Sequence, residues 1–442
     1  MLKSKNSLLD YYAVVAPSTI DSELMIRPSK ADGMYLWEGD KKYIDFDASV
    51  ATVPLGHKHP LVNEAIFKQL DTVDSVECSA RPPKFSITVS NHEYEISPEA
   101  LGRRLLNSIF PNEDARIIYG VTGAEAVNIA SKFLLYQRPR RRRFIAFEGA
   151  FHGRKGYALD LTLSKAEQKR YYPTSGITVL HLPFPKKLED IERIKNTLAR
   201  YPLDEVNAIF VEAIQGEGGI ECFDKKLWRT LVPVLTENKI AIVADEIQCG
   251  VGRTGSMWGF QSVGIQPDIV IAGKGLANGT PISVVAYKRE LEKKLLTNGW
   301  DAGTFPGHPT ALAAGTIAFS LIELEKTREY IREMGEYLSR KLELAILKKH
   351  KEDNYCVVKG VGLMQGIEFR HFDDTPDPKT RDITLRVMKK RGMLTIPCGH
   401  SSINPTIRLL PPYIIQKEHI DQLTSCLHET FASLKKQPFK NR

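Results

Sequence analysis

The 442-residue chain is 42% hydrophobic and 26% charged, which allows one large buried core and a second, smaller domain. Its net charge of +8 could suit acidic partners, but the sequence contains no nucleic-acid-binding module and no basic stretch interleaved with aromatic residues, so we expect no nucleic-acid partner. Six cysteines without paired spacing indicate neither a metal site nor a disulfide framework and suit a reducing cytoplasm, and no apolar run approaches the roughly 20 residues of a membrane span.

Residues 119–128 predict the end of a strand, a turn and the start of a helix. Thr122 and Glu125 have the spacing of a capping box, in which two side chains bond N–H groups at the start of a helix. The small residues Gly123 and Ala124 would also let a phosphate approach, because a helix N-terminus is a ready anion site. The capping box alone does not imply a phosphate, and both interpretations can hold together.

Residues 144–154 predict a strand that runs into a glycine-containing turn, and the basic run before it, residues 138–143, is expected to be a solvated loop. Phe151, in the turn, could cover a flat heteroaromatic ring by offset stacking, although most phenylalanines are ordinary core residues. Residues 210–219 predict another buried strand that ends in acids and glycines. Its two glutamates, Glu212 and Glu217, could equally be solvated loop acids.

Two short apolar runs, residues 240–244 and 269–272, are typical of parallel strands buried on both faces. Asp245 and Lys274 lie where these runs end, and ligands of open α/β sheets collect at the carboxyl ends of strands. A buried aspartate needs a cationic partner, which a pyridinium N–H would supply, and Lys274 could form a Schiff base with an aldehyde if burial lowers its pKa. Either residue alone could be structural, but the pair, with the glycine-rich turn at residues 250–255 that we expect near a ligand, favours a site for a pyridine aldehyde.

In these residues the chain resembles the class III, fold type I aminotransferases that depend on pyridoxal 5′-phosphate, the group of 4-aminobutyrate, ornithine, acetylornithine and lysine ω-aminotransferases. Residues 33–46 and 56–60 look like the family's amino-terminal hairpin and the entry to its first long helix. The resemblance covers about residues 33–412. It implies an α/β fold in which a large, mostly parallel sheet is sandwiched by helices and joined to a smaller α+β domain.

The resemblance also implies roles for single residues. Lys274 would bond the cofactor covalently and then act as general base and acid, and Asp245 would keep the ring nitrogen protonated. The other implied cofactor ligands are Gly123 and Ala124 at the phosphate, Phe151 on the ring, Gln248 at the phenolic oxygen, and Thr304, which would reach the phosphate of a neighbouring subunit. A homodimer with shared active sites follows if Thr304 has this role.

Four further residues are implied near the substrate: Arg154, Arg408, Glu217 as a mobile gate, and Glu212 near the ring substituents. The two arginines would hold a dicarboxylate, which favours glutamate and 2-oxoglutarate as one substrate pair. Glu217 would pair with Arg408 when the amino donor has no carboxylate near the reacting carbon, and would swing away for glutamate. We therefore expect transfer of an amino group from an ω-amino or diamino acid of the 4-aminobutyrate, ornithine or lysine type to 2-oxoglutarate, which yields an aldehyde and glutamate.

Two other functions remain open. An amino-acid racemase or epimerase of the same fold would keep the lysine and the ring clamp but return the proton to the substrate carbon. A non-catalytic relative is disfavoured, because Lys274, Asp245 and both arginines are present. Departures from the family pattern at residues 85–97, Lys155 and His308 leave the identity of the amino donor open.

For the domain organisation, we predict a small-domain segment at residues 1–65, a large cofactor-binding domain at residues 66–325 and a return to the small domain at residues 326–442. An amphipathic pattern over residues 317–347 predicts helices that link the two domains. Residues 371–378, rich in aspartate and proline, predict a surface loop.

Overall fold

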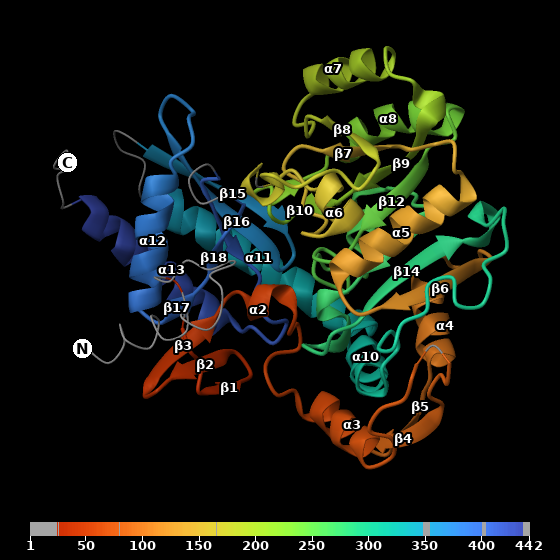
Figure 1. Ribbon diagram of the computed structural model, residues 1–442. Helices are drawn as coiled ribbons and strands as arrows, with labels where there is room; N and C mark the ends of the chain where they lie inside the picture. Colours follow the sequence, from red (N-terminus) through yellow and green to blue (C-terminus); the bar gives the residue numbers. More distant parts are fainter. Residues whose placement is uncertain are drawn as a thin grey trace.

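The structure is a computed structural model that describes residues 24, 26–78, 80–164, 166–347, 354–399 and 404–435. Its central element is a seven-stranded sheet with the order β6-β14-β13-β12-β9-β7-β8 (Figure 1). These strands are β6 (Ala115–Gly120), β7 (Arg143–Phe147), β8 (Thr178–Leu182), β9 (Val206–Val211), β12 (Ala241–Asp245), β13 (Ile269–Ala272) and β14 (Ser283–Lys288). Within this sheet β14 alone runs against its neighbours, so the expected mostly parallel sheet is confirmed.

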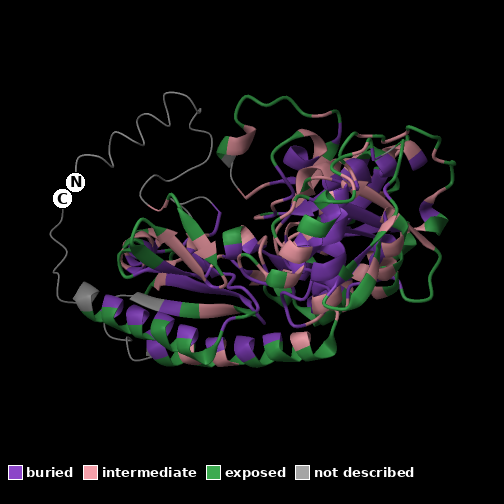
Figure 2. Cartoon of the chain, turned by 90° about the horizontal axis from the view of Figure 1, so that it is seen from below, coloured by how far each residue is buried: buried purple, intermediate pink, exposed green. Residues whose placement is uncertain are grey.

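Helices cover both faces of this sheet, and successive residues of one strand enter different cores. Ile209 and Phe210 of β9, for example, belong to two separate apolar clusters. Strands buried in this way read as continuous apolar runs, and Figure 2 shows the buried residues in the interior, in strands and in central helices alike, and the exposed ones on the outer surfaces. The helices of this part are α3 (Pro60–Leu70), α4 (Pro98–Ile109), α5 (Gly123–Gln137), α6 (Gly156–Leu161), α7 (Leu188–Leu198), α8 (Lys225–Glu237), α9 (Gly259–Val263) and α10 (Pro309–Ile322), with short 3-10 helices η1 (Ala166–Lys169), η2 (Leu203–Glu205), η3 (Lys274–Ala277) and η4 (Arg289–Leu291).

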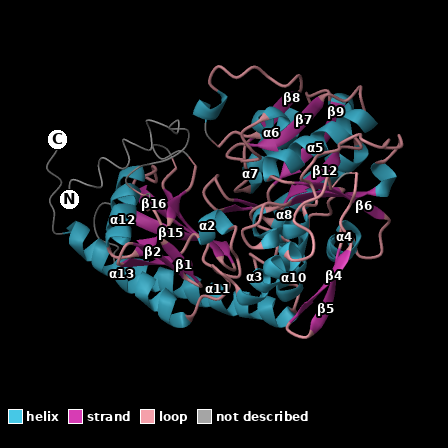
Figure 3. Cartoon of the chain, turned by 60° about the horizontal axis from the view of Figure 1, so that its bottom comes forward, coloured by secondary structure: helices cyan, strands magenta, loops and turns pink. Residues whose placement is uncertain are grey.

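Strands from distant parts of the chain build the smaller sheets. The expected amino-terminal hairpin is present as β1 (Lys30–Asp32), β2 (Tyr35–Glu38) and β3 (Lys41–Asp45), which β17 (Met393–Leu394) joins in parallel to β3. A four-stranded antiparallel sheet follows the order β15 (Asn354–Val361), β16 (Met364–His371), β19 (Thr406–Leu409) and β18 (Ile396–Pro397). Three helices accompany these sheets, and Figure 3 shows α11 (Glu325–Leu347) running beside α13 (Lys417–Lys435), with α12 (Pro378–Lys390) next to them.

Most local predictions outside the site are confirmed. The amphipathic pattern over residues 317–347 corresponds to the end of α10 and to α11, and a loop precedes α12 at residues 372–377. Residues 85–97 form a hairpin of β4 (Phe85–Val89) and β5 (His92–Ile96) that packs against α3 and α10. The division at residues 65 and 325 stays a prediction. Among the described residues, no helix has the length and apolar character needed to cross a membrane.

In the basic run at residues 138–143, residues 138–142 form a loop and Arg143 begins β7, and the run is not simply solvated. Arg138 donates to the carbonyl of Lys239, Arg141 to the carbonyl of Val206 and Arg142 to that of Gly176. These guanidinium groups donate hydrogen bonds to backbone carbonyls of neighbouring loops and strand ends. The three arginines of the run therefore stabilise the fold itself.

A short left-handed turn brings the amino-terminal segment to the sheet. Residues of α2 (Ala48–Ala51) have φ angles between 48° and 66°, although none is glycine. This conformation costs roughly 1–2 kcal/mol per residue for L-amino acids, so the surrounding packing must hold it. A Cβ atom on Gly275 would lie 3.3 Å from the carbonyl oxygen of Ala51, and glycine at that position therefore lets the turn approach the backbone next to Lys274.

Candidate active site

Asp245 and Lys274 meet at the carboxyl edge of the large sheet. β12 and β13 are parallel neighbours, Asp245 is the last residue of β12, and Lys274 follows β13 after one glycine. Both side chains border a cleft of about 350 Å³. The other lining residues of this cleft are Thr122, Gly123, Ala124, Phe151, His152, Gly153, Arg154, Lys155, Glu212, Glu217, Ile247 and Gln248.

Nine of the eleven residues predicted for the site therefore line one cleft. Arg408, a tenth, reaches it from β19, donating from Nη1 to Gln248 Oε1 at 3.0 Å and from Nη2 to Glu217 Oε1 at 2.8 Å. Thr304 does not line it: the residue is exposed, in a loop that borders a second cavity of about 440 Å³ near the start of α5. A role for Thr304 in a neighbouring subunit stays a prediction.

The start of α5 offers the anion site of the cleft. The capping box is confirmed, since Thr122 Oγ1 accepts the N–H of Glu125 at 3.2 Å and Glu125 Oε2 accepts the N–H of Thr122 at 3.3 Å. The N–H groups of Gly123 and Ala124 lie in the first turn, where the helix itself provides no acceptor. Because both residues line the cleft, these N–H groups can hold a phosphate while the cap remains in place.

Sequence reasoning missed His152, which lies beside Asp245. The His152 side chain is fully buried, and its Nδ1 lies 2.7 Å from Asp245 Oδ2. Burial alone would lower the pKa of His152, but the hydrogen bond and the charge of Asp245 outweigh it and raise the pKa. Its position directly after Phe151, where the chain turns away from the end of a strand, was the available signal. His152 thus orients the carboxylate that faces the cleft.

Glu212 supports the two turns that flank the cleft. Its Oε1 accepts the N–H of Phe151 at 2.9 Å and its Oε2 that of Gly216 at 3.2 Å. Burial raises the pKa of Glu212 to about 7, with attraction by His152 and repulsion by Asp245 acting in opposite directions. Glu212 therefore fixes the position of Phe151, and its predicted place near the ring substituents stays a prediction.

Lys274 has the properties of a reactive amine. Burial, followed by repulsion from Arg408, lowers the pKa of Lys274 to about 8, against the attraction of Glu217 and Asp245. A neutral amine is the nucleophile that reacts with an aldehyde, and a lowered pKa raises the neutral fraction near neutral pH.

Gln248 lies between Arg408 and the rest of the cleft. Its Oε1 accepts from Arg408, so its Nε2 is directed away from that guanidinium and can donate to another group. A Cβ atom on Gly216 would overlap the Gln248 amide, which explains why the turn beside Glu217 needs a glycine.

One prediction about the site is wrong. The glycine-rich residues 250–255 do not line the cleft but pack against the carboxyl-terminal part of the chain. Within them Arg253, almost completely buried, donates to the carbonyls of Leu363 and Pro411. A Cβ atom on Gly252 would lie 2.7 Å from Ile322. These glycines allow close packing of protein on protein, not the approach of a ligand.

The arrangement fits a planar, phosphorylated pyridine with an aldehyde group. The start of α5 provides N–H groups for the phosphate, and Phe151 and Ile247 provide apolar walls. Asp245 can accept the ring N–H, and the Lys274 amine can bond the aldehyde.

Comparisons with known proteins agree with this chemistry. The family model described as aminotransferase class-III matches residues 18–431. The acetylornithine aminotransferase of Methanocaldococcus jannaschii is 34% identical, over 91% of this chain and 93% of its own. The LysW-aminoadipate semialdehyde/glutamate semialdehyde transaminase of Sulfolobus acidocaldarius is 30% identical, over 90% of this chain and 93% of its own. Among solved structures, a transaminase from the marine bacterium Virgibacillus matches 98% of this chain and 99% of its own with a TM-score of 0.85, at 22% identity.

Proposed function

Because the chain belongs to the class III aminotransferase family, whose enzymes depend on pyridoxal 5′-phosphate, we propose that it moves an amino group from an ω-amino or diamino acid to 2-oxoglutarate. The main support for these two substrates is the ion pair between Glu217 and Arg408, which lies next to the predicted cofactor residues. The relatives named above act on acetylornithine and on semialdehydes, and these names favour a donor that leaves as a semialdehyde.

The cofactor residues are proposed from the geometry of the cleft. When bound, pyridoxal 5′-phosphate supplies an aldehyde for the amino group and a ring that takes up the electrons released at the donor carbon. Asp245, oriented by His152, would accept the ring N–H, and the N–H groups of Gly123 and Ala124 would bind the phosphate. Phe151 would keep the ring plane in position, and Gln248 Nε2 would donate to the phenolic oxygen.

Lys274 would also move the proton. Its neutral Nζ, which the lowered pKa of about 8 favours, would accept the proton of the donor carbon and return it.

The Glu217–Arg408 pair would sort the two substrates. With the pair formed, Arg408 is neutralised and the cleft accepts a donor that has no carboxylate near its reacting carbon. A 2-oxo dicarboxylic acid brings a carboxylate that competes with Glu217 for Arg408, and Arg154 would bind its second carboxylate. Arg154 lines the cleft with its guanidinium carbon 5.5 Å from the centre of the Phe151 ring.

We also propose a homodimer in which Thr304 of one subunit completes the phosphate site of the other. The cytoplasm stays the compartment that the cysteine pattern predicts.

Half-reactions test this proposal. The holoenzyme is given one amino donor without a keto acid, with acetylornithine, ornithine, lysine and 4-aminobutyrate tried separately, and the visible spectrum is followed. We expect conversion to the amino form of the cofactor, and glutamate after 2-oxoglutarate is added. An unchanged spectrum with loss of optical rotation of an amino acid would instead identify a racemase.

A further inference from the structure

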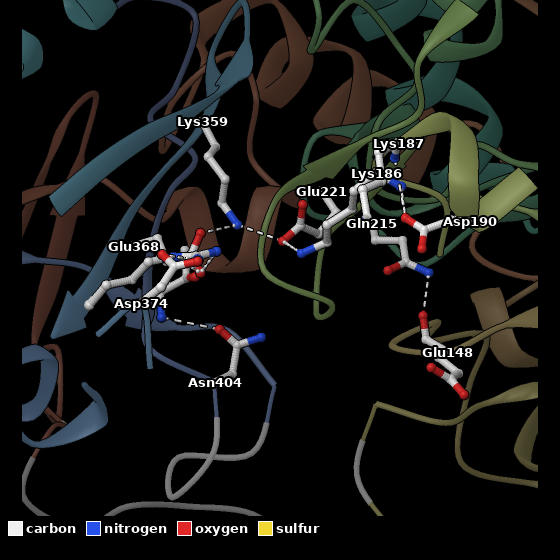
Figure 4. A network of polar contacts seen from close by, with 12 residues as sticks. Glu148, Lys186, Lys187, Asp190, Gln215, Glu221, Lys359, Glu368, Asp374 and Asn404 are labelled. Carbon is white, nitrogen blue, oxygen red and sulfur yellow. Dashed lines mark hydrogen bonds and ion pairs between the residues drawn. The ribbon is translucent and has the colours of Figure 1, made fainter. Parts of the chain in front are cut away.

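The gate residue Glu217 lies on a short hairpin whose base carries a second ion pair. The hairpin is formed by β10 (Ile214–Gln215) and β11 (Glu221–Cys222), and Glu217 lies in the turn between them. At the base, Glu221 Oε1 lies 2.7 Å from Lys359 Nζ of β15 (Figure 4). Both ends of the turn are thus bound to the antiparallel sheet that contains Arg408.

Two of the cations that bind the hairpin, Lys359 and Arg408, belong to one row of this sheet, and a third, Lys186, lies 2.9 Å from Glu221 outside the sheet. Lys359 pairs with Gly366 of β16, and Gly366 pairs with Arg408 of β19. Residues opposite one another in neighbouring strands project to the same face, so Lys359 and Arg408 face the hairpin together across a glycine. Lys359 holds Glu221 while Arg408 holds Glu217 at 2.8 Å.

The gap left by the glycine in this row is occupied by the hairpin itself. Ile220 is fully buried, and a Cβ atom on Gly366 would lie 3.0 Å from its Cγ1. A Cβ atom on Gly360, next to Lys359, would lie 2.9 Å from Ile220 Cγ2. Ile220 therefore fits between the two ion pairs, and the hairpin cannot slide along the row unless this side chain leaves its place.

The Lys359 pair is well placed to hold the hairpin. The side chains of Lys359 and Glu221 are 15% and 16% exposed, so solvent and salt screen them less than a surface pair. Lys359 also forms an ion pair with Glu368 of its own sheet (Figure 4), and the two charged atoms lie 2.8 Å apart. Burial alone would lower the pKa of Lys359, but Glu221 and Glu368 outweigh it and raise the pKa, so the lysine stays charged.

Space for a released Glu217 exists behind the hairpin. A cavity of about 420 Å³ is bordered by Glu217, Gly218, Glu221 and Lys359, and Glu217 also borders the 350 Å³ cleft. Rotation of its own side chain would take the carboxylate away from Arg408 and from the Gly399 N–H, which Glu217 Oε2 accepts at 3.0 Å, and would require no movement of the hairpin.

We propose that Lys359 is a positioning residue for the gate: it anchors the hairpin through Glu221, so that the gate opens by rotation of Glu217 into this cavity. The inference rests on the proposed function of the Glu217–Arg408 pair. Without the anchor, the hairpin moves and Glu217 pairs with Arg408 for a smaller fraction of the time. Dicarboxylates then bind more tightly, and donors without a carboxylate near the reacting carbon bind less well.

The test compares Lys359→Met with Lys359→Arg, Glu221→Gln and Glu217→Gln in the holoenzyme. Calorimetry measures the Kd of glutarate, a dicarboxylate that cannot react, and steady-state kinetics measure KM and kcat for both substrates. We expect Lys359→Met to lower the glutarate Kd about three- to tenfold and to raise the donor KM by a similar factor, with little change in kcat. Lys359→Arg should restore both values. Lys341→Met is the matched control, because Lys341 forms an ion pair with Asp421 at 2.6 Å on the helices away from the hairpin.

The outcomes separate this inference from the proposed function. If Glu217→Gln leaves the glutarate Kd unchanged, the gate itself is refuted. If Glu217→Gln tightens glutarate binding and Lys359→Met does not, the gate stands and the anchor is overturned. Should Lys359→Met fail to fold, Glu221→Gln removes the ion pairs of Glu221 with both Lys359 and Lys186, and an unchanged glutarate Kd in that variant overturns the anchor as well.

Discussion

Replacing His152 tests whether its bond to Asp245 holds a buried carboxylate in place. Leucine at position 152 has a similar volume but cannot donate to Asp245 Oδ2, which accepts at 2.7 Å in a site where both side chains are almost fully buried. A hydrogen bond to a charged group contributes about 1.5–3 kcal/mol, and little solvent is present here to screen it. We expect the free energy of unfolding of the apoenzyme to fall by about that amount in His152→Leu. Asparagine can place its amide nitrogen near the position of Nδ1, so His152→Asn should lose less than about 1 kcal/mol.

The shifted pKa of His152 also predicts how the stability difference between wild type and His152→Leu changes with pH. The pKa of His152 is raised above its ordinary value of 6.5 in the folded protein, so its charge contributes stability fully below that value and loses it as pH rises through the folded pKa. Urea titrations followed by tryptophan fluorescence, at about pH 6 and about pH 9, should therefore show a larger difference between wild type and His152→Leu at the lower pH. Equal losses for leucine and asparagine, or a difference that grows with pH, would refute the reasoning.

Three further predictions concern single residues. The rate at which the apoenzyme forms an adduct with pyridoxal should rise with pH through about 8, where Lys274 becomes neutral. Lys274→Ala should abolish the adduct. A midpoint near the ordinary lysine pKa of 10.5 would contradict the lowered pKa. Thr122→Ala should lower apoenzyme stability in urea by about 0.5–2 kcal/mol because it removes the cap of α5, and Thr122→Ser should keep most of it; equal stability of both variants would count against the cap. Arg141→Met should lower the free energy of unfolding by about 1–2 kcal/mol, because the carbonyls of Val206 and Asn238 lose a donor. Its retention on a heparin column should stay close to that of the wild type. A clear drop in retention without a loss of stability would show that the basic run binds a partner instead.

The fold was predictable where its cause is local. The continuous apolar runs that become β12 and β13 reflect burial on both faces. A capping threonine marks the start of α5, and a proline is the first residue of α4 and of α10. The reversed direction of β14 was not predictable, because one sequence carries no information on which strand pairs with which.

In the candidate site, too, some residues were predictable from the sequence and others were not. Asp245 and Lys274 were recognisable because polar residues after buried strands collect at one edge of a sheet. The prediction that residues 250–255 lie near a ligand was wrong, because a glycine indicates a close approach of the backbone but not whether the neighbour is a ligand or another part of the protein. The role of His152 could not be predicted, because it depends on the contact with Asp245 in the folded chain. The same holds for Lys359, whose partner Glu221 lies 138 residues away in the chain.

The pairing of β3 with β17 has a consequence for synthesis on the ribosome. Ile44 finds its strand partner at Met393, about 350 residues later. At a translation rate of roughly 5–20 residues per second, the first strands leave the exit tunnel some 20–70 s before their neighbour exists. During that interval the edge of β3 that β17 later covers has no native partner, so its backbone N–H and C=O groups are open to pairing with other chains.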